Sequence, residues 1–108
     1  ATSTATGDVS ECKAIRSVFN NTPNRPAVSS TKALTGHALS LSSIMEAAFS
    51  VLSISNNFTP GSAHIENLDP QCQDLNIIRE SRDQGPETVL SNSSGFGGAN
   101  VSLLFQKP

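Results

Sequence analysis

His37 and Lys32 are the residues of this chain whose types and spacing could do chemistry. His37 stands directly before a long segment with helical apolar periodicity, and Lys32 lies five residues earlier on the incoming turn. At a helix N-terminus the positive end of the dipole disfavours an imidazolium, so we expect a neutral ring. A neutral histidine can donate a hydrogen bond to a developing oxyanion. Taken alone, a helix-start histidine and a solvated lysine are the simpler interpretation of this pair.

A second candidate is the glycine-rich stretch that runs from Asn92 to Asn100. It departs from the GxGxxG phosphate-binding pattern, because Asn100 stands where the last glycine is required and a β-compatible run follows instead of a helix. Its glycines would permit positive φ angles. The residues leave two interpretations open, a plain hairpin tip and a close approach to a ligand.

The two cysteines, Cys12 and Cys72, lie far apart, and neither belongs to a CxxC or His/Cys cluster. This spacing predicts neither a zinc site nor a disulfide, so both are expected to be structural residues that behave as small hydrophobes. Such cysteine usage fits a reducing compartment, and we expect a cytoplasmic protein.

The charge balance and the apolar content of the chain argue against a nucleic-acid-binding protein and against a membrane-spanning one. The 108 residues carry seven basic and nine acidic side chains, which predicts one domain and, without a basic cluster, no nucleic-acid partner. Only 15% of the residues are charged, against about 25% in an ordinary soluble domain, so part of the surface is expected to be covered by something else. Serines and Glu46 interrupt the longest apolar stretch, and the first residues are no signal peptide, so no membrane span is expected.

The elements that must position these residues follow from periodicity. A helix is predicted to begin at Asp8 as N-cap, with Glu11 closing a capping box, and to end near Asn20. A second helix, 38–55, has a broad apolar face and a stripe of serines, which favours an interior position. The segment 31–37 between them is predicted to be a turn. Short β-compatible runs are expected at 26–30, 75–78, 88–93 and 99–105, the last two as a hairpin, which gives a layered α/β pattern.

Four motifs in order resemble the C-terminal part of the beta-ketoacyl-[acyl-carrier-protein] synthases, the condensing enzymes of bacterial fatty-acid synthesis. The family reads Thr-Ser-Thr, Gly-Asp-x-x-Glu, Ser-x-Thr-Lys-x-x-x-Gly-His and Asn-Ser-Phe-Gly-Phe-Gly-Gly-x-Asn. The matching stretches here are 2–4, 7–11, 29–37 and 92–100. The resemblance covers nearly the whole chain. It implies a thiolase-like layered α/β/α fold, of which residues 1–108 would form most of the C-terminal half-domain, with the N-terminal half absent.

The resemblance also implies an activity and roles for residues. The reaction would be a decarboxylative Claisen condensation of a malonyl thioester with an acyl group held on a cysteine outside this chain. His37 would hydrogen-bond the malonyl thioester carbonyl, and Lys32 would organise the site through Glu11. The remaining implied roles are pantetheine binding by Thr2 and Thr4, gating of the acyl chain by Phe96, and a monovalent-cation site formed by Glu46, Ser91 and Asn92.

No cofactor is implied beyond the phosphopantetheine arm of acyl carrier protein, which carries the substrate. The implied partners are that carrier protein, the N-terminal half of the same fold, and a second subunit in a homodimer or a ketosynthase heterodimer. An alternative is a catalytically silent partner that shapes the acyl tunnel, like a chain-length factor.

The chain departs from the family at two places. The usual Gly-His-x-Leu-Gly-Ala-Ala-Gly is replaced by Gly36-His37-Ala38-Leu39-Ser40-Leu41-Ser42-Ser43, and Ser94 replaces the first Phe of the last motif. These changes favour the silent partner, whereas the presence of both Lys32 and His37 favours the enzyme.

Overall fold

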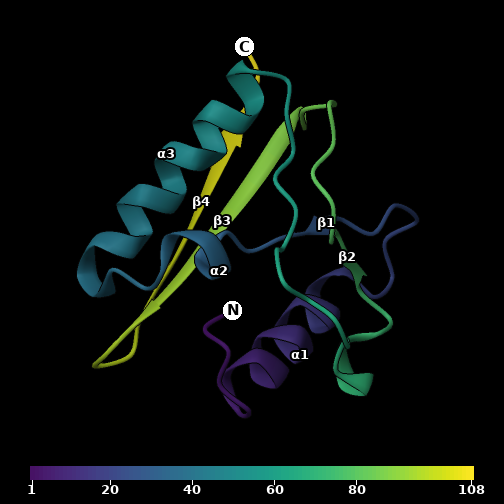
Figure 1. The fold of residues 1–108 in the computed structure, drawn as a ribbon, viewed down its shortest axis with the longest axis vertical. Coiled ribbons are helices and arrows are strands. Elements are labelled where there is room, and N and C mark those ends of the chain that lie inside the picture. The colour runs from purple at the N-terminus through teal and green to yellow at the C-terminus, as the bar shows by residue number, and fades with distance from the viewer. The chain divides into compact units, whose positions relative to one another are not determined.

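The computed structural model describes all residues from 1 to 108 (Figure 1). They divide into two compact units. Unit 1 comprises residues 1–36 and 61–80, and unit 2 comprises residues 37–60 and 81–108. Each unit is therefore built from two separate segments of the chain.

Unit 1 combines helices with a short parallel strand pair. Its elements are α1 (Gly7–Phe19), β1 (Ala27–Val28), α2 (Lys32–Thr35), the 3-10 helix η2 (Pro70–Cys72) and β2 (Asn76–Ile77). Strands β1 and β2 pair in parallel, with Ala27 opposite Asn76. Buried Ser62 extends this pairing, because its N–H donates to the carbonyl of Ile78 at 2.8 Å and its hydroxyl accepts the N–H of Ser30 at 3.0 Å.

Unit 2 is a helix packed along a hairpin. Its elements are the 3-10 helix η1 (Leu39–Leu41), α3 (Ser42–Ser55), β3 (Thr88–Gly95) and β4 (Ala99–Gln106). The strands are antiparallel and pair in register from Thr88 opposite Gln106 to Gly95 opposite Ala99. Figure 1 shows α3 lying along the two strands. Gly97 and Gly98, with φ of 83° and 84°, close the hairpin in a conformation that glycine adopts without strain.

Helix α3 is covered on one side only within these residues. Its buried side chains are small, namely Ser42, Ala47 and Ser53. Larger apolar side chains remain exposed, with Ile44 at 63% and Leu52 at 54%. Of the predicted serine stripe, Ser53 is buried, Ser50 is half-buried and Ser43 is exposed, so the interior position predicted for the whole helix is not reached in this chain by itself.

Most elements agree with the sequence-based expectation, and three details differ. The α/β class, the first helix and the hairpin are confirmed. The predicted turn at 31–37 instead contains α2, because Lys32–Thr35 makes one helical turn in which Gly36 N–H donates to the Lys32 carbonyl at 2.9 Å. The second helix begins at Ser42 and not at Ala38, since η1 precedes it.

The third difference is the start of α1. The N-cap residue is Thr6, without a side-chain cap, so the predicted capping box of Asp8 and Glu11 is wrong. Both carboxylates instead turn toward the residues that precede the helix. The N–H of Thr2 donates to Asp8 at 2.9 Å, and Glu11 lies 2.7 Å from the backbone nitrogen of Ala1.

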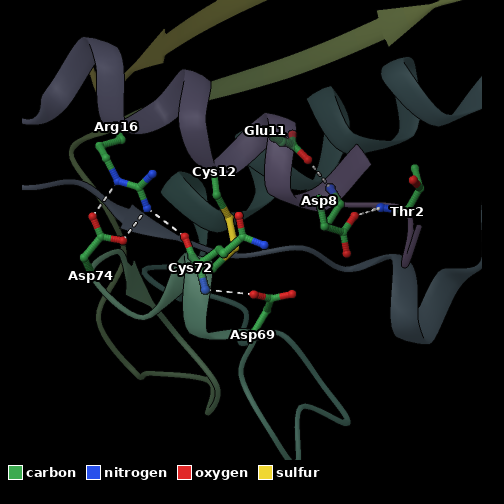
Figure 2. The surroundings of a disulfide bond; sticks show 10 residues. Thr2, Asp8, Glu11, Cys12, Arg16, Asp69, Cys72 and Asp74 are labelled. Atoms are coloured by element: carbon green, nitrogen blue, oxygen red, sulfur yellow. Dashed lines mark hydrogen bonds and ion pairs between the residues drawn. A yellow bond between two sulfur atoms is a disulfide. The ribbon is translucent and has the colours of Figure 1, made fainter. Parts of the chain in front are cut away.

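The expectation that Cys12 and Cys72 are unpaired is wrong. A disulfide joins them, and their Cα atoms are 5.8 Å apart, within the usual span of such a bridge (Figure 2). Both cysteines are buried, and the bond ties α1 to η2 in unit 1. The expectation of a reducing compartment rested on unpaired cysteines, so the disulfide removes that argument.

No helix of this structure combines the length and the apolar character needed to cross a membrane.

Candidate active site

The backbone conformation of Gly36 directs the chain into the His37 segment. Gly36 follows α2 with φ 74° and ψ 178°, a region that essentially only glycine occupies. A Cβ added there would meet no atom within 4 Å, so the requirement for glycine comes from the backbone angles and not from crowding.

His37 is held through its Nδ1 atom. The N–H of Leu39 donates to Nδ1 at 3.2 Å, and the hydroxyl oxygen of Ser42 lies 2.9 Å from the same nitrogen. A ring nitrogen that accepts a backbone N–H carries no hydrogen of its own, so the neutral ring has its hydrogen on Nε2. His37 can therefore offer Nε2–H as a donor, which is what stabilisation of an oxyanion requires.

The reason for this arrangement differs from the one expected. His37 was predicted to stand at the first turn of the long helix, but η1 lies between the histidine and α3. The dipole effect falls off within the first helical turn, so the hydrogen bonds to Nδ1, and not the dipole, favour the tautomer with hydrogen on Nε2.

Leu39 adopts a strained backbone conformation beside the histidine. Its φ is 52°, which is unusual for a large side chain and costs of order 1–3 kcal/mol. That conformation accompanies the N–H bond to Nδ1. Strain of this kind is typical of sites where geometry matters more than local stability.

Lys32 is the first residue of α2 and is half-buried in unit 1, whereas His37 opens unit 2. The structure therefore places each residue within its own unit. The proposed cooperation between the two remains a prediction.

Thr2 and Thr4 lie together before α1 in unit 1. Their hydroxyl oxygens are 3.3 Å apart, and both threonines are exposed (Figure 2 shows Thr2). A Cβ on Gly7 would meet the hydroxyl of Thr4, so a larger residue there would require this hydroxyl to move. Exposed neighbouring hydroxyls suit the binding of a polar arm, and this role stays a prediction.

Phe96 is at the tip of the hairpin in unit 2. Phe96 is fully exposed, and it is followed by the two glycines with positive φ. An aromatic ring that touches nothing in its own unit is free to contact another part of the protein or a ligand. The gating role stays a prediction.

The three residues suggested for a monovalent cation are in unit 2. Ser91 is half-buried, whereas Asn92 is exposed and its side-chain oxygen accepts the Ser102 hydroxyl at 2.8 Å. Adjacent strand residues point to opposite faces of a sheet, so the side chains of Ser91 and Asn92 lie on opposite faces of the hairpin. The cation site stays a prediction.

Sequence reasoning missed a charged cluster beside the disulfide (Figure 2). The Arg16 guanidinium donates to both carboxylate oxygens of Asp74, at 2.6 and 2.5 Å, and to the Gln71 carbonyl at 2.7 Å. Arg25 donates to the backbone carbonyl of Asp74 at 2.8 Å. The hydrogen bonds from Arg16 lower the pKa of Asp74, and the same bonds raise the pKa of Arg16. No local signal could have revealed the cluster, because each of its hydrogen bonds joins residues 49 to 58 positions apart along the chain.

Known proteins of one family resemble this chain. Residues 1–66 match the family model described as beta-ketoacyl synthase, C-terminal domain. Over 106 residues the chain is 47% identical to 3-oxoacyl-[acyl-carrier-protein] synthase 1 of Escherichia coli strain K12. It is 44% identical over 107 residues to synthase 1 of Haemophilus influenzae, and 43% identical over 107 residues to synthase 2 of Staphylococcus aureus strain COL. Each alignment covers 98% of this chain but 26% of the relative, so the chain spans about a quarter of the length of these proteins.

Proposed function

Because the chain belongs to the beta-ketoacyl synthase family, whose C-terminal domain matches residues 1–66, we propose that it works as the C-terminal portion of a 3-oxoacyl-[acyl-carrier-protein] synthase. The family implies a thiolase-like fold, with which the mixed helices and strands agree. The proposed reaction is decarboxylative condensation: a malonyl thioester loses carbon dioxide, and the resulting enolate carbon attacks the carbonyl of an acyl group bound to a cysteine. The new C–C bond replaces the acyl C–S bond, and the cysteine leaves as its thiolate.

The acyl-bearing cysteine must come from outside these residues. Cys12 and Cys72 are bonded to each other and buried, so neither offers a free thiolate. We therefore propose that the rest of the enzyme supplies the nucleophilic cysteine, whereas this segment supplies the oxyanion donor, His37.

The observation that carries the proposal is the hydrogen bonding of His37. Decarboxylation leaves negative charge on the thioester oxygen, and an N–H donor aimed at that oxygen stabilises the transition state. With Nδ1 accepting from Leu39, the donor is Nε2–H. In this proposal His37 does not transfer a proton. It donates a hydrogen bond while the C–C bond to the leaving carboxylate breaks.

Other residues are given supporting roles in this proposal. Lys32 supplies a fixed positive charge that organises the site together with Glu11. Thr2 and Thr4 bind the phosphopantetheine arm through their exposed hydroxyls, and Phe96 gates the acyl chain. These roles rest on the motifs that surround each residue.

We propose acyl carrier protein as the partner that delivers the substrate, with no further cofactor. The rest of the synthase would cover the exposed apolar side chains of α3, and a dimer is the proposed assembly. The proposed compartment is the cytoplasm, where the disulfide of unit 1 would be unusual.

The experiment that tests this function uses the full-length protein and measures carbon dioxide released from malonyl-[acyl-carrier-protein]. We expect His37→Ala to lower the rate by about a hundredfold or more, the usual cost of removing an oxyanion donor. His64→Ala is the matched control, because His64 is an exposed histidine of unit 1 outside the proposed site, and its rate should stay unchanged. No release by the unmodified protein would overturn the proposal in favour of a catalytically silent, tunnel-shaping partner.

A further inference from the structure

We propose that Ser42 is a positioning residue for His37: its hydroxyl donates to Nδ1 and helps to keep the ring as the tautomer with hydrogen on Nε2. The consequence for catalysis rests on the proposed function. The tautomer itself does not, and it can be measured separately.

The contact is specific to the first residue of α3. The Oγ atom of Ser42 lies 2.9 Å from Nδ1 of His37, and Ser42 is only 8% exposed. Because the N–H of Leu39 points at the same nitrogen, Nδ1 cannot hold a hydrogen, so in this pair the hydroxyl is the donor. Two donors thus share one ring acceptor.

Ser42 is the firmer of the two donors. The Leu39 bond is 3.2 Å long, at the far end of the usual range for an N–H donor, and depends on a backbone with φ 52°. The Ser42 hydroxyl oxygen is closer, and the backbone that carries it belongs to the helix that begins at this residue. A serine inside a helix commonly bonds a carbonyl one turn earlier, whereas this hydroxyl is directed at the histidine instead.

The Ser42 hydroxyl is not part of the family motif and is specific to this chain. In the Gly-His-x-Leu-Gly-Ala-Ala-Gly pattern given above, alanine stands at the place of Ser42. The substitution therefore adds a donor beside the proposed oxyanion-binding histidine without adding a charge.

The test measures the ring nitrogens of His37 by NMR in the full-length protein labelled with ring-¹⁵N histidine, at alkaline pH where the ring is neutral. The resonances are assigned by their loss in His37→Gln. We expect Nδ1 to resonate as an unprotonated acceptor. Ser42→Ala should move the Nδ1 resonance because one donor is lost, and Ser42→Thr, which keeps a hydroxyl, should restore it.

Ser43→Ala is the matched control, since Ser43 is the next serine of the same helix and is exposed. It should leave the Nδ1 resonance in place. Thermal unfolding of each variant establishes that it is folded. If Ser42→Ala leaves the Nδ1 resonance where it is in the unmodified protein, the proposal is overturned.

The catalytic part has its own readout. Loss of one neutral hydrogen bond to the ring should lower the rate of malonyl decarboxylation about fivefold at saturating substrate, with little change in KM. A moved resonance with an unchanged rate would overturn this catalytic part. A full-length protein that releases no carbon dioxide would overturn the proposed function and leave the NMR result to decide the role of Ser42.

Discussion

At the scale of single residues, Gly36 offers the most direct test of how the His37 segment is built. Gly36→Ala should destabilise the full-length protein by about 1–3 kcal/mol, because alanine is strained at φ 74° and ψ 178°. Urea unfolding measures this change. Gly95→Ala is the matched control, since Gly95 lacks a positive φ and its added Cβ would make only ordinary contacts of 3.7 Å or more. Equal stability of the two variants would show that Gly36 does not need its observed conformation.

The sequence singled out His37 as a hydrogen-bond donor, a role that stays a prediction, and the structure changes the physical argument for it. A histidine before an apolar-periodic segment indicated a neutral donor, and the bonds to Nδ1 agree with that chemistry. The helix-dipole argument placed His37 too close to the helix, because the boundary depends on η1, which apolar periodicity does not reveal. Leu39 and Ser42 were not singled out, since their roles arise from distances that only the folded chain fixes.

At the scale of elements, local patterns were sufficient where local interactions decide the structure. The spacing of apolar residues predicted α1 and most of α3, and alternation around a glycine-rich turn predicted the hairpin of β3 and β4. Contacts between distant segments could not be predicted in this way. The Cys12–Cys72 bond and the Arg16–Asp74 pair both join α1 to the segment at η2, and no local sequence pattern predicts either of them.

The disulfide should therefore contribute measurable stability to the full-length protein. It closes a loop with a sequence separation of 60 residues, for which the chain-entropy model gives about 4 kcal/mol. Cys12→Ala and Cys72→Ala should each lose about this amount in urea unfolding under non-reducing conditions. The double variant should lose little more than either single variant, because both changes break the same bond. Additive losses, or two reactive thiols in the native protein, would argue against the bridge.

At the scale of the whole molecule, the low charge and the exposed apolar side chains have one explanation. Only 15% of the residues are charged, and no large side chain is fully buried. Many large apolar residues are more than a third exposed, among them Ile44, Val51 and Leu52 on α3 and Leu90 and Leu104 on the hairpin. Since the chain spans about a quarter of the length of its relatives, these surfaces are the places where we expect the rest of a synthase to pack.

This expectation predicts how the 108 residues behave by themselves. The isolated segment should bind a hydrophobic dye, associate at micromolar concentration and unfold without a sharp transition, because its core is too small to offset the entropy of ordering the chain. In the full-length protein, the amides of α3 and β4 should instead be protected from hydrogen exchange, since the packing that covers them makes their opening costly. Differential scanning calorimetry of the segment and hydrogen exchange of the full-length protein provide the two measurements. A monomeric segment with a cooperative melt would contradict the prediction, because it would show that the apolar faces of α3 and the hairpin need no further covering.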